Sequence, residues 1–181
     1  MNAKNSARAL LIVAVLAAVL ASATSCASFQ RDLLAKSAGD AADKDIDSLE
    51  KAIAPLEASP APESIVQARS LVSDLERKGI RDAVFEARLA AWSGRLSLIE
   101  GKRVDAEKLA KRSLSLLPGD VPGTVLSLRL ERDGNLRLEG IEKALLIDPS
   151  SGQYLLERAN TLLELRRYRE GVAAFDAAFP L

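Results

Sequence analysis

The chain of 181 residues contains no histidine, one cysteine, one methionine and one tryptophan. Without histidine there is no Ser-His-Asp triad, no Cys-His nucleophile pair and no histidine-ligated metal site. One cysteine cannot form an internal disulfide, a zinc knuckle or a ferredoxin-type cluster. We therefore expect a protein that is not an enzyme and that holds neither a cofactor nor a metal.

Neither sign of charge is in excess, because Lys plus Arg and Asp plus Glu each number 25. Nucleic-acid binding needs extra cations that neutralise phosphates, so this balance argues against a nucleic-acid partner. Aromatic residues make up 4% of the chain, whereas the hydrophobic class, mostly Ala and Leu, makes up 48%. Abundant Ala, Leu, Glu, Lys and Arg with few β-branched residues favour helices over strands.

The first 25 residues have the three parts of an export signal. Lys4 and Arg8 form a basic start, an unbroken apolar run spans 9–21, and small residues precede Cys26. The apolar run is shorter than the about 20 residues that a membrane-spanning helix requires. A tilted N-terminal membrane anchor is the alternative interpretation.

The stretch 23–26, Ala-Thr-Ser-Cys, resembles the bacterial lipoprotein box, in which the cysteine is lipidated and cleavage occurs just before it. Ala23 replaces the usual Leu, as is tolerated in looser lineages such as spirochaetes. The resemblance implies a signal peptide over 1–25 and a lipid on Cys26 that anchors the chain to a bacterial cell membrane, facing the periplasm. Ala27 stands where enteric inner-membrane lipoproteins have Asp, which favours the outer membrane.

After an expected tether and irregular helix over 26–42, helix breakers recur at near-regular intervals. Between them apolar residues follow helical steps of three and four, as Ile46, Leu49 and Ile53 do. Sustained alternation of apolar and polar residues is rare, so strands are not expected. The breakers are Gly39, 60–62, Gly79, Gly101, 118–119, Gly134, Pro149 and Gly152.

Residues 87–181 also repeat a pattern of small, large and aromatic side chains. In its last unit the pattern consists of Ala159, Leu162, Tyr168, Gly171, Phe175 and Ala178. This order resembles the tetratricopeptide repeat, and Pro118 and Pro149 lie 149 − 118 = 31 residues apart, close to that family's 34. The resemblance implies an all-α, right-handed superhelical solenoid, with about three repeats in 87–181 and a degenerate helical pair in 43–86. An unrelated helical bundle is the alternative.

In tetratricopeptide proteins the first helix of each pair lines a concave groove. In some family members an Asn at the place of Asn160 holds a peptide backbone or a terminal carboxylate. Leu128 occupies the equivalent place in the middle repeat, which argues against a complete carboxylate clamp. The candidate groove residues are Arg95, Leu98, Leu128, Arg132, Gln153, Leu156, Asn160 and Leu163.

The last predicted helix is followed by no polar capping helix, although repeat arrays normally end with one. Val172, Phe175 and Phe179 recur along it at helical spacing. Exposed apolar patches usually mark contact sites. We expect this face to dock a partner protein or another copy of the chain, which would form a homo-oligomer.

The resemblance as a whole implies a membrane-anchored periplasmic adaptor or scaffold that binds another protein. A first alternative is a ligand-binding accessory of a TRAP-type solute uptake system, because spirochaetes have tetratricopeptide lipoproteins that associate with periplasmic solute-binding proteins. A second alternative is an outer-membrane or pilus assembly factor. An apolar tunnel would favour the uptake accessory, whereas a solvated groove lined by Arg, Asn and Glu would favour the adaptor.

Overall fold

The computed structural model describes residues 39–178, and the chain divides into two compact units, Met1–Asp43 and Lys44–Leu181. The predicted export signal, the lipidation at Cys26 and the side chain of Phe179 lie outside the described residues. In the first unit residues 39–43 are helical. Across residues 39–178 the chain forms helices joined by turns and loops, with no strand, which confirms the all-α prediction for this range.

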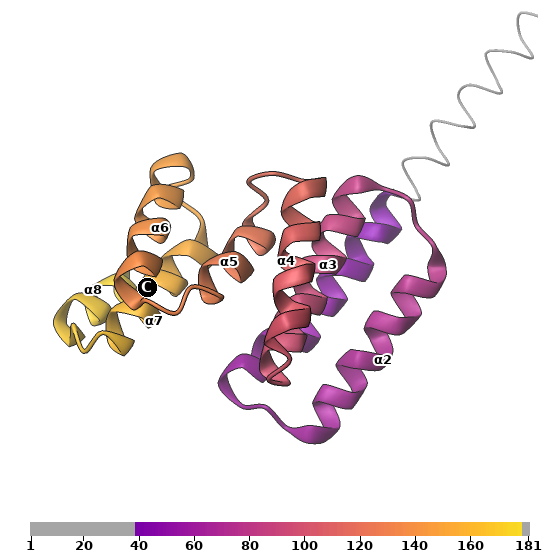
Figure 1. The fold of residues 1–181 in the computed structure, drawn as a ribbon, viewed down its shortest axis with the longest axis horizontal. Helices are drawn as coiled ribbons and strands as arrows, with labels where there is room; N and C mark the ends of the chain where they lie inside the picture. The colour runs from indigo at the N-terminus through magenta and orange to yellow at the C-terminus, as the bar shows by residue number, and fades with distance from the viewer. Residues whose placement is uncertain (1–38, 179–181) are drawn as a thin grey trace, which may run out of the picture. The chain divides into compact units, whose positions relative to one another are not determined.

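The second unit begins with a helix over residues 44–58, which we call segment 44–58. Within 39–178, no helix is long and apolar enough to span a membrane. The helices that follow, shown in Figure 1, are α2 (Pro62–Lys78), α3 (Ala83–Ile99), α4 (Arg103–Leu116), α5 (Val121–Arg129), α6 (Gly134–Ile147), α7 (Gly152–Glu164) and α8 (Tyr168–Ala178).

Local signals set the helix boundaries. Pro62 opens α2, where a missing backbone N–H costs nothing, and Gly79 ends it with a left-handed φ of 62°. Asp82 caps α3, because its carboxylate accepts a hydrogen bond of 2.8 Å from the backbone N–H of Phe85. Asp133 caps α6 in the same way through the N–H of Asn135.

Helix α3 contacts α2, α4 and α5. Its buried residues include Trp92 and Leu96, which are 1% and 0% exposed. A Cβ added at Gly94 would collide with Leu126 of α5 and would lie 3.2 Å from Cβ of Leu109 in α4. The absence of a side chain at Gly94 is therefore what lets α3 approach both neighbours closely.

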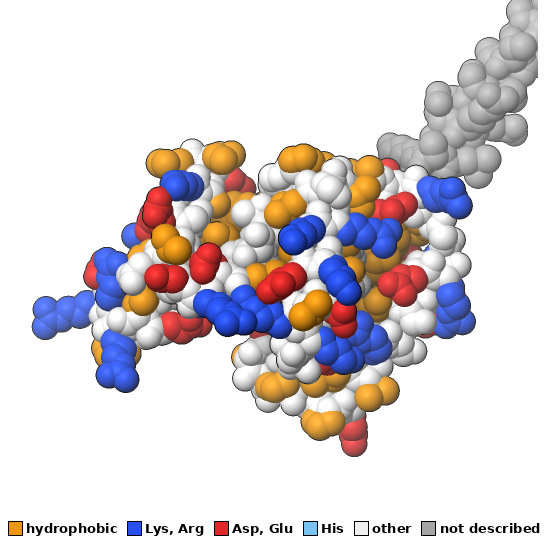
Figure 2. All heavy atoms as spheres, viewed as in Figure 1, with side chains coloured by type: hydrophobic (Ala, Val, Ile, Leu, Met, Phe, Trp, Pro, Cys, Tyr) orange, Lys and Arg blue, Asp and Glu red, His pale blue; other side chains and the backbone are white. Residues whose placement is uncertain are grey.

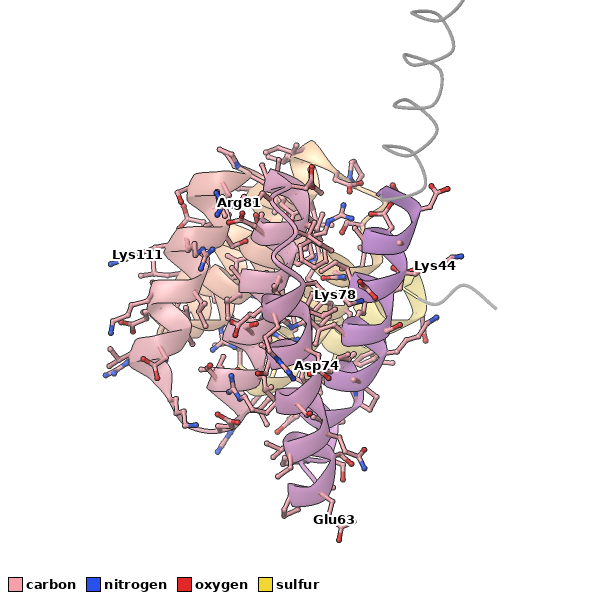
Figure 3. The ribbon with its side chains drawn as sticks, turned by 90° about the vertical axis from the view of Figure 1, so that its right-hand side faces the viewer. Lys44, Glu63, Asp74, Lys78, Arg81 and Lys111 are labelled. Atoms are coloured by element: carbon pink, nitrogen blue, oxygen red, sulfur yellow. The ribbon has the colours of Figure 1, made fainter. Side chains whose placement is uncertain are left out.

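Helices α6, α7 and α8 share a smaller core made of Leu138, Ala159, Leu162 and Ala174. The predicted pair over 43–86 corresponds to segment 44–58 and α2, which are joined by an ion pair of 2.6 Å between Asp45 and Lys78. Lys78 is labelled in Figure 3. Helix α3 begins at Ala83, before the predicted start of the repeats at residue 87. The superhelical solenoid itself stays a prediction.

Candidate functional site

Helices α3, α5 and α7 form one face, which we call the inner face, and segment 44–58 covers it. Helix α5 contacts both α3 and α7. Near the starts of the three helices, Ile46 and Glu50 of the segment share a cavity lining with Arg88, Val121 and Gln153. The segment therefore crosses the first helix of each predicted repeat.

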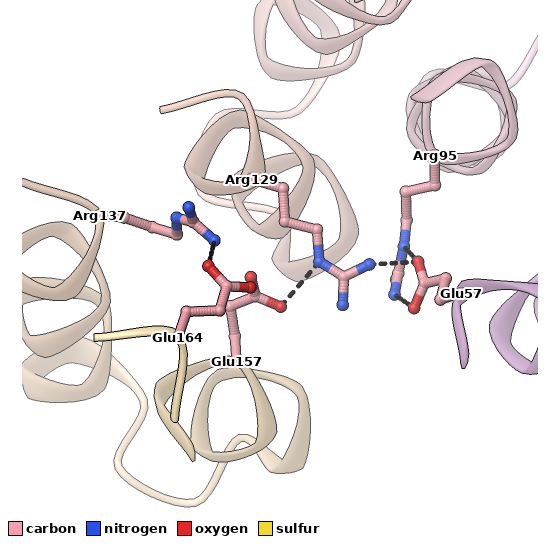
Figure 4. Close-up of polar contacts among 6 residues, drawn as sticks. All are labelled: Glu57, Arg95, Arg129, Arg137, Glu157 and Glu164. Carbon is pink, nitrogen blue, oxygen red and sulfur yellow. Dashed lines mark hydrogen bonds and ion pairs between the residues drawn. The ribbon is translucent and has the colours of Figure 1, made fainter. Parts of the chain in front are cut away.

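Glu57 of the segment lies between two arginines of the inner face. Its carboxylate accepts two hydrogen bonds from Arg95 of α3, of 2.6 Å from Nε and 2.7 Å from Nη2. The same carboxylate forms an ion pair with Arg129 of α5. Arg129 in turn donates from Nε to Glu157 of α7 at 2.7 Å. Figure 4 shows these contacts, which join the segment to all three helices of the face.

The network is largely removed from water, since the side chains of Arg95 and Glu157 are 6% and 4% exposed. Burial lowers the pKa of Arg95, although the hydrogen bond to Glu57 opposes the shift. Burial also acts to lower the pKa of Arg129, but Glu157 and Glu57 outweigh it and the pKa is raised. The two arginines and two glutamates balance in charge, which is the arrangement that buried ions require.

Arg95 has a second partner, the ring of Trp92 in the preceding turn of α3. Its guanidinium carbon lies 4.1 Å from the ring centroid, within the range of a cation–π contact. Trp92 is the tryptophan of this chain and is 1% exposed. The packing of α3 is thus coupled to the ion network.

A groove of about 720 Å³ opens beside the network. Both apolar and polar side chains line it, and an ion pair of 2.9 Å joins Arg137 and Glu164. The lining residues are Ala54, Glu57, Ala58, Leu98, Arg129, Arg137, Leu156, Glu157, Asn160, Leu163, Glu164 and Phe175. These groups offer surfaces for apolar side chains and hydrogen-bonding partners for a backbone.

The structure brings part of the predicted groove set together. Leu98, Leu156, Asn160 and Leu163 line the groove. Arg95 instead donates two hydrogen bonds to Glu57. Gln153, near the start of α7, donates a hydrogen bond of 3.4 Å to Glu50.

The two middle-repeat candidates lie elsewhere. Leu128 packs toward α6, because a Cβ at Gly140 would lie 2.5 Å from its Cδ2, and Arg132 is exposed in the turn after α5. Arg129 occupies the groove instead. A signal for it exists, since 129 − 95 = 34 equals the tetratricopeptide period. Glu57 has no such signal, because it precedes the repeats.

The predicted C-terminal docking face is described only in part. Val172 is exposed to 57% of its surface. Phe175 is half-buried, packs against the core of α6, α7 and α8, and also borders the groove. Phe179 lies outside the described residues.

Two further observations bear on chemistry. Among residues 39–178, no group of three or more acidic, thiol or imidazole side chains is placed to hold a metal ion. On the visible face in Figure 2, positive and negative side chains occur together.

No protein-family model, curated protein or solved structure matches the chain. Arguments about function therefore start from the residues of the groove and the inner face.

Proposed function

We propose that the protein is a membrane-anchored tetratricopeptide-like lipoprotein that acts as an interaction adaptor in the periplasm. The observation that carries the proposal is the groove, whose lining mixes apolar and hydrogen-bonding groups. Leu98, Leu156 and Leu163 provide an apolar floor for partner side chains. Asn160 provides an amide that can both donate to and accept from a peptide backbone.

The expected energetics follow from this lining. A few buried apolar anchors supply most of the affinity of a protein interface, and charged groups at its edge set orientation and association rate. Here Glu164, whose side chain is 59% exposed, is placed to act at the edge. The partner segment would therefore bind through one or two apolar residues placed between α3 and α7.

The mixed lining also favours the adaptor over the uptake accessory. An apolar ligand would have to displace water from Arg129, Arg137 and Glu164 without offering them hydrogen bonds, and such desolvation is costly. A peptide carries its own donors and acceptors and meets this requirement. The membrane anchor is supported by the sequence around Cys26 alone.

Photo-crosslinking in the native membrane tests the adaptor. A photoreactive residue in place of Leu163 should capture one stoichiometric protein, whereas the same residue at Leu136 in α6, which is 55% exposed, should not. Leu156→Glu should abolish the capture, because it places a charge on the apolar floor of the groove. Equal crosslinks from both positions, or none from Leu163, would contradict the proposal.

The anchor requires a separate measurement. Cys26→Ser should move the full chain from the membrane fraction into the soluble periplasmic fraction after lysis, because one covalent site carries all the acyl chains. Cys26→Ser protein that still sediments with membranes would count against lipid attachment.

A further inference from the structure

The inner face is occupied by the chain itself. The apolar side of segment 44–58, formed by Ile46, Leu49, Ile53 and Leu56, is at most 4% exposed. Its polar contacts reach the face through Glu50 to Gln153 and through Glu57 to Arg95 and Arg129, while Asp45 pairs with Lys78 of α2. The pattern is that of an amphipathic helix lying in a groove, with apolar anchors at helical spacing and one central carboxylate.

The segment is a weak helix. Pro55 lies inside it and has no N–H to donate to the carbonyl of Lys51, so one helical hydrogen bond is missing. Only residues 59–61 connect the segment to α2. Its helical conformation therefore depends on the helices packed around it, α2 among them, more than on its own sequence.

The segment also leaves part of the face unfilled. Ala54 and Ala58, one helical turn apart, border the groove of about 720 Å³ with Leu98, Leu156 and Leu163. Both alanines are exposed. A helix with larger apolar residues at these two positions would bury more apolar surface on the same face.

We infer that segment 44–58 is a replaceable occupant, and that the partner is an amphipathic helix that displaces it from the inner face. The partner helix carries a carboxylate at the position of Glu57, where Arg95 and Arg129 receive it, and larger apolar residues at the positions of Ala54 and Ala58. This inference rests on the proposed function, because it names the kind of partner segment that the adaptor binds.

Synthetic peptides test the exchange without the natural partner. The basic probe is a fluorescein-labelled peptide with the sequence of residues 44–60. A filled peptide carries Ala54→Leu and Ala58→Leu, and a third adds Glu57→Gln to the filled peptide. We expect the filled peptide to bind the full chain about tenfold more tightly than the basic one. The Gln version should bind about tenfold more weakly than the filled one, because it loses the charge-assisted hydrogen bonds.

A crosslinked protein supplies the matched control. Glu50→Cys and Gln153→Cys, in a chain with Cys26→Ser, place two thiols where the segment meets α7 and allow a short bismaleimide to join them. The joined protein should bind no peptide, whereas the same protein before joining should bind at least as tightly as the wild type, because it lacks the hydrogen bond between Gln153 and Glu50. Equal binding before and after joining, or equal affinity for the basic and filled peptides, would overturn the inference.

Hydrogen exchange on the unmodified full chain keeps the test independent of these variants. Saturating filled peptide should increase the amide exchange of residues 44–58 and leave that of α7 unchanged. Bound peptide that leaves the exchange of 44–58 unaltered would place it elsewhere and overturn the inference. So would a filled peptide that does not bind at millimolar concentration.

The two proposals fail in different ways. If the joined protein still captures the partner in the soluble periplasmic fraction, the adaptor stands and the exchange is wrong. If peptides displace the segment but Leu163 captures no protein, the exchange stands and the adaptor is wrong.

Discussion

Helix α3 and helix α8 differ sharply in how many of their residues are buried. Eleven residues of α3 are buried, among them the polar residues Ser93, Arg95 and Ser97. Helix α8 buries only Gly171 and Ala174 among its described positions, and it leaves Tyr168 and Val172 more than half exposed. The difference follows from neighbours, because α3 contacts α2, α4 and α5 whereas α8 packs mainly against α7.

This contrast separates stability from binding. Substitutions along α3 should be costly, since each buried side chain there is fixed by packing or by the ion network. Substitutions on the outer side of α8 should leave the fold intact. The measurements below would break or sharpen this division.

The largest effect is expected at Arg95. Arg95→Ala removes the bidentate partner of Glu57 and the cation above Trp92, and should lower the free energy of unfolding by about 3–5 kcal/mol. Denaturant unfolding followed by the fluorescence of Trp92 measures it. The control is Arg158→Ala, which removes a more exposed ion pair with Glu142 and should cost about 1 kcal/mol or less. Equal losses of unfolding free energy in the two variants would show that the buried network stabilises the fold no more than an exposed ion pair does.

A smaller effect on α3 should come from a single methyl group. Gly94→Ala places a Cβ against Leu126, and relieving the collision should cost about 1–3 kcal/mol. Gly152→Ala is the matched control, because a Cβ there meets nothing within 4 Å and Ala favours the helix. We expect its melting temperature to rise or stay the same. A Gly94→Ala protein as stable as wild type would mean that α3 and α5 are less closely packed.

Acid should weaken one contact of α3 in a predictable direction. Burial acts to raise the pKa of Glu100, but hydrogen bonds from Arg69 and Lys102 outweigh it, so the pKa is lowered. A lowered folded-state pKa contributes stability above the unfolded value, about 4.3 for Glu, and this stability is lost as the pH falls through the folded value. Glu100→Gln should therefore cost about 1 kcal/mol at pH 7.

The difference between Glu100→Gln and wild type should shrink toward zero as both are titrated below pH 4. Unfolding curves at a series of pH values measure it. A difference that is constant from pH 7 to pH 3 would show that the carboxylate charge is not what holds α2 to the end of α3.

Local pattern predicted the helices, and half of the candidate groove residues do line the groove. Leu156, Asn160 and Leu163 follow steps of four and three, so a regular α7 places them on one side. In the middle repeat the pattern did not predict the groove residue, because α5 has only nine residues and ends at Arg129. Counting from repeat markers there selected Leu128, one position too early, and so missed the residue that receives Glu57.

Long-range contacts had no local signal at all. Glu57 and Arg95 are 38 residues apart, and nothing in the pattern around either one pairs them. The prediction of segment 44–58 as half of a degenerate repeat used its apolar spacing, and that spacing fits a helix lying across the inner face equally well. Periodicity identifies the buried side of a helix but not the surface that buries it.

The smallest effect on stability is expected at the exposed side of α8. Val172→Ser should change the free energy of unfolding by less than about 0.5 kcal/mol, because this side chain is 57% exposed. Ala174→Ser is the comparison, since Ala174 is 2% exposed and a hydroxyl there must be buried within the core of α6, α7 and α8. If this face joins two copies of the chain, light scattering should show a lower mass for Val172→Ser at unchanged stability. An unchanged mass at every concentration, with wild type and variant alike monomeric, would show that the exposed valine of α8 binds no second copy.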